Sequence, residues 1–150
     1  MITALLLIAL LLLSSCSKAP QKDLGELMQS INEEFFLNDM ETVKTTEELA
    51  SRFLIGEGDV SDFCVQYASD SDERQEIILV HAKDEDAAFR VKTVLYNRLD
   101  SYLSNSKSYS PEEYAVLEKC AVNVYNNTYV TLTVAERAEE IDKYIEEYLR

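Results

Sequence analysis

The period of the hydrophobic positions changes along this chain, and each period predicts a kind of element. Between residues 23 and 36 apolar side chains recur every three or four positions, which is typical of an amphipathic helix. Thr45 and Glu48 then form a capping box, in which Thr45 caps a short helix and Glu48 reaches back. Gly56 and Gly58 end that helix. Residues 23–58 are therefore predicted to hold two helices.

Four later segments are predicted to be β-strands, because three alternate apolar and polar residues with a period of two and one is a short apolar run between polar residues. They cover residues 60–68, 75–82, 121–125 and 129–134. Residues 69–74 form the polar connection of a first hairpin. Asn126-Asn127 makes the tight turn of a second, because asparagine tolerates a positive φ. Residues 77–80 are apolar on both faces, so the second strand is expected inside the sheet.

Helices are also predicted around these hairpins. One begins at the acidic residues 84–86, runs to Tyr102 and is followed by a loop at 105–108. A short helix begins at Ser110-Pro111, and a last helix covers residues 135–149. The predicted order is α-α-β-β-α-α-β-β-α. The fold class expected for residues 23–150 is a single α+β domain, with a mainly antiparallel four-stranded sheet packed with helices.

The N-terminal residues predict where the protein is located. Residues 4–13 form an unbroken apolar run that leads into Leu13-Ser14-Ser15-Cys16. A membrane span needs about 20 apolar residues, so this shorter run predicts a lipoprotein signal peptide at 1–15, cleaved before Cys16. Cys16 would then carry the lipid, and residues 16–22 would tether the domain. Residues 1–4 contain no Lys or Arg, so an uncleaved hydrophobic anchor is the alternative, and the true start need not be Met1.

The net charge argues against nucleic acid as a partner, and it indicates that the lipid on Cys16 makes the contact with the membrane. The chain has 28 Asp and Glu residues against 14 Lys and Arg, a formal charge of −14. Such a surface repels phosphate backbones and no Lys/Arg cluster counters it, which argues against nucleic-acid binding. The surface also repels anionic lipids. We therefore expect the lipid on Cys16 to hold the domain at the extracytoplasmic face of the cell membrane.

Several segments after Val60 carry a family resemblance. They are residues 77–80, Asn97-Arg98-Leu99, the run YSPEEY at 109–114 and the run NTYVTLTV at 127–134. Together they resemble small lipoproteins of Gram-positive bacteria that share an extracytoplasmic domain of unknown function. Members of that family often have glycine in the last hairpin, where this chain has Asn126-Asn127. The resemblance implies the same fold and location, and it supplies no catalytic residues.

Candidate catalytic and metal-binding residues are few. His81 is the only histidine, and plausible hairpin registers place Cys64 nearby, so a thiol–imidazole pair is the alternative, enzymatic interpretation. The acidic residues 70–73 lack the glycine and the distal glutamate of an EF-hand. One histidine with scattered cysteines has no zinc spacing, so no metal or other cofactor is expected. The sequence leaves open whether Cys64 and Cys120 form a disulfide.

A tyrosine cluster near the last hairpin provides the candidate binding surface. Tyr125 and Tyr129 flank the Asn126-Asn127 turn, and Tyr129 shares a strand face with Thr131. Because the aliphatic face of this strand belongs in the core, Tyr129 is expected on the opposite, exposed face, where a rigid ring can bind a partner. Cover by another helix, such as residues 23–36, is the competing interpretation. The expected function is a non-catalytic binding or assembly module that contacts an envelope protein or a small ligand.

Overall fold

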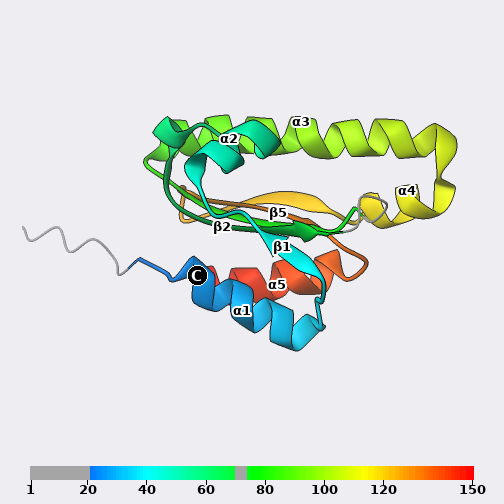
Figure 1. The fold of residues 1–150 in the computed structure, drawn as a ribbon, viewed down its shortest axis with the longest axis horizontal. Coiled ribbons are helices and arrows are strands. Elements are labelled where there is room, and N and C mark those ends of the chain that lie inside the picture. The colour runs from blue at the N-terminus through cyan, green and yellow to red at the C-terminus, as the bar shows by residue number, and fades with distance from the viewer. Residues whose placement is uncertain (1–20, 70–73) are drawn as a thin grey trace, which may run out of the picture.

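The computed structural model describes residues 21–69 and 74–150 (Figure 1). The predicted signal peptide, the lipid site Cys16 and the acidic residues 70–73 lie outside the described residues. Within the described ranges, no helix is long and apolar enough to cross a membrane.

In residues 21–69 and 74–150, five antiparallel strands form one sheet, in the order β1-β2-β3-β5-β4. The strands are β1 (Met40–Thr42), β2 (Val60–Ala68), β3 (Glu76–Ala82), β4 (Ala121–Tyr125) and β5 (Tyr129–Val134). The helices are α1 (Leu24–Phe35), α2 (Thr46–Phe53), α3 (Glu85–Tyr109), α4 (Pro111–Leu117) and α5 (Ala138–Leu149), with a 3-10 turn at Glu57–Asp59. Figure 1 shows α2 and α3 on one face of the sheet and α1 and α5 on the other. The prediction of a single α+β domain with an antiparallel sheet is confirmed.

The prediction of four strands is wrong by one short edge strand. β1 has three residues and pairs with the end of β2, with Met40 opposite Ala68 and Thr42 opposite Gln66. Three residues are too few to show a period of two. Hydrophobic patterning therefore could not distinguish this strand from a loop.

The loop predicted at residues 105–108 is also wrong, because α3 continues to Tyr109. Ser106 lies seven positions after Leu99, on the same inward face of the helix, and is 2% exposed. Because serine is polar, hydrophobic periodicity cannot identify Ser106 as an inward-facing residue. The inward face of α3 is therefore longer than its hydrophobic stripe.

β3 lies at the centre of the sheet, and its side chains enter both cores. Ile77 and Leu79 belong to the core beneath α1 and α5, whereas Ile78 and Val80 belong to the core beneath α2 and α3. All four side chains are at most 1% exposed. Full burial of one such aliphatic side chain is worth about 1.5–3 kcal/mol. The prediction that this strand lies inside the sheet is confirmed.

The first described residues are fastened to one end of the sheet. The backbone N–H of Lys22 donates to the Tyr129 hydroxyl at 3.1 Å. The hydroxyl of Tyr148, on α5, donates to the Asp23 carbonyl at 3.2 Å. The Lys22 ammonium also lies 5.5 Å from the centre of the Tyr148 ring. Residues 22 and 23 therefore meet the last turn of α5 and the first residue of β5. Figure 1 shows the start of α1 beside the end of α5.

Candidate functional site

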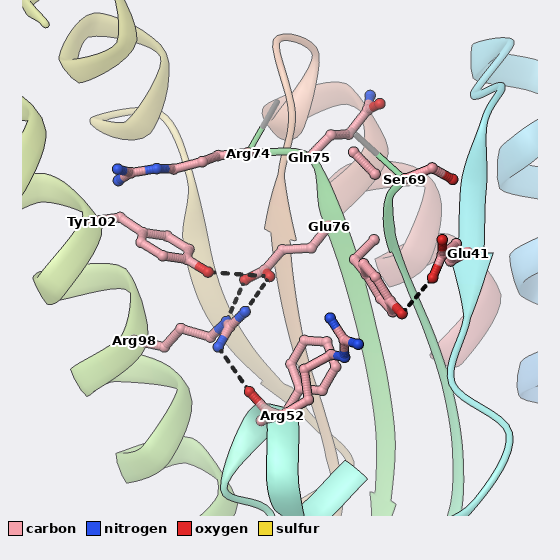
Figure 2. A pocket seen from close by; sticks show the side chains of 11 residues that line it. Glu41, Arg52, Ser69, Arg74, Gln75, Glu76, Arg98 and Tyr102 are labelled. Atoms are coloured by element: carbon pink, nitrogen blue, oxygen red, sulfur yellow. Dashed lines mark hydrogen bonds and ion pairs between the residues drawn. The ribbon is translucent and has the colours of Figure 1, made fainter. Parts of the chain in front are cut away.

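An open cleft of about 460 Å³ lies at the opposite end of the sheet, where β2 ends and β3 begins, on the α2 and α3 face (Figure 2). Its charged lining residues are Glu41, Arg52, Arg74, Glu76 and Arg98, and its rings are Phe53, Tyr67 and Tyr102. We call it the arginine cleft, because three of the six arginines in the chain line it. Its volume is in the range of small-molecule and cofactor sites.

A buried ion pair forms the floor of the cleft. Arg98, on α3, donates from Nε and Nη2 to the two carboxylate oxygens of Glu76, at 2.7 and 2.8 Å. Its Nη1 donates to the Arg52 carbonyl at 3.3 Å, and the Tyr102 hydroxyl donates to Glu76 at 3.3 Å (Figure 2). The Glu76 side chain is only 6% exposed. The two hydrogen bonds from Arg98 therefore offset the cost of removing the Glu76 charge from water.

The ion pair and its burial set the pKa values on the floor. Burial alone would lower the pKa of Arg98, but the hydrogen bonds and charge of Glu76 raise it overall. Burial, followed by the charge of Glu76, raises the pKa of Tyr102 to about 12. Arg98 is therefore always charged, and Tyr102 keeps its proton at neutral pH. Both groups can orient a ligand, and neither is prepared to accept a proton.

Two arginine–tyrosine stacks form the rim of the cleft. The guanidinium carbon of Arg52, at the end of α2, lies 4.4 Å from the centre of the Tyr67 ring. The guanidinium carbon of Arg74 lies 5.1 Å from the centre of the Tyr102 ring. The two arginine side chains are 50% and 37% exposed. The rings restrict the guanidinium groups while leaving them in contact with solvent.

Counting only partners among the residues that the structure describes, both rim arginines retain hydrogen-bonding capacity. The nearest carboxylate oxygen to Arg52 Nε belongs to Glu48 and is 3.9 Å away, beyond hydrogen-bond distance. Arg74 Nε lies 3.0 Å from a carboxylate oxygen of Glu113. Since a guanidinium carries five N–H donors, each can take a further acceptor.

Hydrophobic patterning did not single out the floor of the cleft, because it places charged residues on the surface by default. A signal was nevertheless present. Glu76 directly precedes the segment that is apolar on both faces, and Arg98 sits next to Leu99 on the inward stripe of α3. An acid and a base at the margins of two buried segments predict an ion pair between them. Arg52 and Arg74 carried no comparable signal, because their meeting depends on how α2 and the hairpin are placed.

Cys64 and His81 lie on the other face of the sheet from the cleft. Cys64 is opposite Leu79, and His81 is opposite Asp62 and Tyr129, so the two are diagonal neighbours rather than a direct cross-strand pair. The His81 ring stacks on Tyr129 with 4.3 Å between ring centres. Its Nδ1 is buried and has no hydrogen-bond partner among the described residues. The histidine therefore packs on an aromatic ring and has no orienting partner there.

The pKa values of this pair oppose nucleophilic chemistry. Burial, followed by the negative charges of Asp62 and Asp23, raises the pKa of Cys64 to about 11. Burial lowers the pKa of His81, although the charge of Asp62 acts in the opposite direction. Both groups are therefore neutral at pH 7, whereas cysteine nucleophiles react as thiolates. The geometry does not support the interpretation of Cys64 and His81 as a catalytic pair.

The exposure predicted for Tyr129 is wrong. Tyr129 is 6% exposed and Thr131 is 1% exposed, because α1 and α5 cover the face that they share with Tyr125. The half-buried Tyr125 donates from its hydroxyl to the carbonyl of Asp142, on α5, at 3.4 Å. The competing interpretation, cover by the helix within residues 23–36, is the one that the structure shows. These three residues pack between layers and do not form an open surface.

The remaining candidates for covalent or metal chemistry are separated in space. Cys64 and Cys120 are free thiols. Cys64 packs against the core beneath α1 and α5, and Cys120 lies in the core beneath α2 and α3, so the sheet stands between them. In the described parts of the chain, no three His, Cys, Asp or Glu side chains are placed to hold a metal ion.

Comparison with known families places this architecture in one of them. Residues 33–135 match DUF4358, a domain of unknown function, as the sequence resemblance implied. The match spans all five strands with α2, α3 and α4, and it leaves most of α1 and all of α5 outside. Neither a curated protein nor a solved structure matches the chain. Because more than half of the chain is matched, the protein belongs to the DUF4358 family.

Proposed function

We propose that this protein is a non-catalytic binding module of the cell envelope, and that the arginine cleft is its ligand site. In this proposal a lipid on Cys16 anchors the protein at the extracytoplasmic face of the membrane. The observation that carries the proposal is the cleft, where Arg52 and Arg74 stack on tyrosine rings above a fully paired floor. Arginine and tyrosine are enriched where proteins make their strongest contacts. The resemblance to lipoproteins of Gram-positive bacteria supports the location.

The cleft is organised in advance of binding. The carboxylate of Glu76 is fixed by Arg98 and Tyr102, and the Tyr67 hydroxyl donates to Glu41 at 2.7 Å. Side chains that are already ordered lose little conformational entropy when a ligand arrives. The lining therefore favours binding, and its buried tyrosine and arginine are held in their protonated forms.

The attachment of the N-terminal segment to the domain supports an orientation in which the arginine cleft opens away from the membrane. The segment is fastened beside Tyr129, which is opposite His81 near the end of β3, whereas Glu76 begins that strand in the cleft. Five residues of strand separate the two positions by about 17 Å. Cys16 precedes Gln21 by five residues, which an extended chain spans in at most about 18 Å. A lipid on Cys16 would therefore hold the Tyr129 end near the bilayer.

The anchor is tested by mass and by location. The intact mass of the protein from its native membrane is expected to show loss of residues 1–15 and a diacylglycerol on Cys16. Cys16→Ala is expected to release or mislocalise the protein, since two acyl chains are what give stable anchoring. An uncleaved, unmodified N-terminus would contradict the proposal.

The cleft is tested by a photoreactive amino acid at Ser69, on its rim, in the membrane-bound protein. We expect an adduct, identified by mass spectrometry, that is lost when Arg52→Gln and Arg74→Gln are introduced together. The same photoreactive residue at Asp100, an exposed position of α3 outside the cleft lining, is the matched control. Equal capture at both positions, or capture that survives the two substitutions, would show that the cleft is not the ligand site.

A further inference from the structure

We infer that two copies of this protein pair along β4, an edge strand of the sheet, and form a symmetric dimer with one continuous sheet. Within the described residues β4 pairs with β5 on one side and has no strand on the other. An edge strand presents unpaired N–H and C=O groups to which a further strand can add. This surface is separate from the arginine cleft, whose lining includes no residue of β4.

The register of the sheet determines which backbone groups of β4 point outward. The Ala82 N–H donates to the Thr128 carbonyl at 2.8 Å, so the Thr128 carbonyl faces β3. Because backbone groups alternate sides along a strand, Tyr129 and every second residue after it face β4. Their partners, which face back toward β5, are Tyr125, Asn123 and Ala121. The N–H and C=O groups of Val122 and Val124 therefore point to the open side, where no backbone hydrogen bond to another described element engages them.

These outward groups match a second copy of the same strand. In antiparallel pairing, an outward residue of one strand must lie opposite an outward residue of the other. A two-fold axis at Asn123 meets this condition, because it places Val122 of each copy opposite Val124 of the other. The sequence Val122-Asn123-Val124 also reads the same in both directions, so the two sides of the axis present identical side chains. Such a self-complementary contact is what a two-fold dimer requires.

β4 lacks the features that keep edge strands from pairing. Natural edge strands are commonly very short, charged, interrupted by proline or bulged. Residues 121–125 contain no charged residue and no proline, and their register with β5 is unbroken. The other edge strand, β1, has only three residues and carries Glu41 at its centre. Of the two edges of the sheet, β4 is therefore the one prepared to receive a strand.

Exposed apolar side chains lie beside this edge. Val124, on the face of β4 that turns toward α3, is 40% exposed. At the start of α3, Glu85 accepts a hydrogen bond at 2.9 Å from the side chain of Asn127, in the β4–β5 turn. Phe89 and Tyr96 follow four and eleven positions later on the same side of α3 and are 70% and 49% exposed. A second copy paired at Asn123 brings the same side chains to the junction from the other side, where they can share apolar contact.

The charges at the two ends of β4 favour the antiparallel orientation. Lys119 precedes β4 by two residues, and the axis at Asn123 places it opposite position 127 of the second copy. At that position the Asn127 side chain binds Glu85. An ammonium and a carboxylate are thereby brought to each end of the junction. The formal charge of −14 on each chain opposes association in general, whereas this local complementarity selects the orientation.

The dimer keeps both proposed lipid anchors on one side. A two-fold axis perpendicular to the continuous sheet leaves the α1 and α5 layers of both copies on the same face. The N-terminal segment leaves from that layer, where Lys22 lies over the ring of Tyr148. Lipids on the two copies therefore reach one bilayer, and the arginine clefts, on the α2 and α3 face, open on the other side.

Disulfide formation across the axis tests the dimer in the full-length protein in its native membrane. In the proposed register the two copies of Asn123 form a non-hydrogen-bonded pair with Cα atoms about 4.5 Å apart, a separation that a disulfide spans. Asn123→Cys with a copper oxidant is expected to give a dimer on a non-reducing gel, and mass spectrometry should locate the bond at position 123 of both chains. The wild-type protein measures the background from Cys64 and Cys120. Glu41→Cys, at the centre of the other edge strand, is the matched control and should give no dimer above that background.

Substitutions at Val124 distinguish strand pairing from chance collision. Val124→Pro removes an outward N–H and none of the hydrogen bonds between β4 and β5, so the crosslink at position 123 is expected to fall about tenfold or more. Val124→Thr keeps this N–H and should leave the crosslink unchanged. Thermal unfolding shows whether each variant is folded. Val124→Lys, which places a charge on an already exposed side chain, is the second disrupting variant and should also reduce the crosslink.

Native mass spectrometry of the wild-type protein from detergent micelles is expected to show two chains. Single chains there, together with no crosslink at position 123, would overturn the inference. So would equal crosslinking of Asn123→Cys and Glu41→Cys, or a crosslink that both disrupting substitutions at Val124 leave unchanged. Capture of a different protein at position 123 would assign the edge to another partner and overturn it as well. None of these outcomes changes the capture at Ser69, so the proposed function is tested independently.

Discussion

Two apolar residues in the described part of the chain hold a backbone conformation that their side chains disfavour. Phe36 ends α1 at φ 54°, and Leu54 ends α2 at φ 60°, both in the left-handed region. The left-handed conformation costs a residue with a Cβ about 1–2 kcal/mol relative to the right-handed one. The side chains are 78% and 75% exposed, so burial does not offset the strain. Glycine is the usual residue at this position of a helix.

Glycine at these two positions should therefore stabilise the fold. Phe36→Gly and Leu54→Gly are each expected to raise the free energy of unfolding by about 0.5–1 kcal/mol, after the entropy that glycine adds to the unfolded chain. Urea unfolding measures the change. Lys143→Gly, at an exposed right-handed position of α5, is the matched control and should cost about 1 kcal/mol. Destabilisation at all three positions would mean that the left-handed residues are not strained.

Asp142 makes stability depend on pH. Burial against the sheet raises the pKa of this carboxyl from 3.8 to about 6, against smaller opposing effects of the Thr133 and Asn123 side chains. The folded state therefore binds this proton more tightly than the unfolded state. By linkage, the contribution to stability is fully present below about pH 4 and is lost as the pH rises through about 6.

Asp142→Asn is accordingly expected to raise the free energy of unfolding by about 1–2 kcal/mol at pH 7, because the charge no longer has to be buried. At pH 3.5 the gain should disappear, since the wild-type carboxyl is then protonated. Urea titrations at the two pH values measure this difference. An equal gain at both would assign the effect to packing instead of ionisation.

Among the elements, the Glu76–Arg98 pair joins β3 to α3, and the Arg98 contact with the Arg52 carbonyl brings in the end of α2. Three elements thus converge on one buried charge. Removing one partner leaves the other charge without compensation, which is far more costly than removing both.

Arg98→Met is therefore expected to destabilise the fold by about 3 kcal/mol, measured by urea unfolding. The double variant Arg98→Met with Glu76→Leu should recover most of that loss, because no unpaired charge is left buried. Arg90→Gln is the surface control and should change stability by less than about 1 kcal/mol. A double variant less stable than Arg98→Met would show that packing of the side chains, and not their charge, holds the elements together.

The elements also show where prediction from the sequence succeeds. Strands β2 to β5 and the central place of β3 followed from period and double-sided apolarity, because these are local consequences of burial. β1 is too short to show a period of two. The polar Ser106 interrupts the apolar stripe of α3, so the pattern does not predict that the helix continues. The cover of Tyr129 by α1 is one of two outcomes that the sequence allows, because the pattern of one strand does not say which distant helix packs on it.

The candidate site was harder to predict than the fold. The arginine cleft gathers residues from β1, α2, the β2–β3 hairpin and α3, and no two of its arginines are close in the sequence. Tyr125 and Tyr129 are close in the sequence, which favours a shared binding surface, yet they pack in a core. The closeness of Tyr125 and Tyr129 in the sequence reflects the turn between them. The residues of the arginine cleft are distant in the sequence, and only the tertiary fold brings them together.

On the scale of the whole molecule, α1 and α5 form one layer from the two ends of the described chain (Figure 1). This layer covers Ile77 and Leu79, which would otherwise face solvent. Its helices lie mostly outside the residues that match the family, so the sheet and α2 to α4 account for the matched part.

A chain that ends after Ala135, without α5, is expected to lose its cooperative thermal unfolding transition, because several fully buried aliphatic side chains on the sheet and α1 would be exposed. Near-ultraviolet circular dichroism and calorimetry measure this loss. A chain lacking only Arg150, which is exposed, is the control. A sharp transition in the chain without α5 would show that the other layer and the sheet fold alone.

The distance in sequence between α1 and α5 also determines when the fold can close. During synthesis Ile31 is made 118 residues before Leu149, an interval of roughly 6–24 s at ordinary translation rates. Helices form in microseconds, so α1 can form and re-form many times before its partner exists. From the time each is made until α5 is complete, the apolar sides of α1 and of β3 have no partner from α5. The nascent chain therefore has one hydrophobic face that only its last helix can cover, and that face is where a holding chaperone would act.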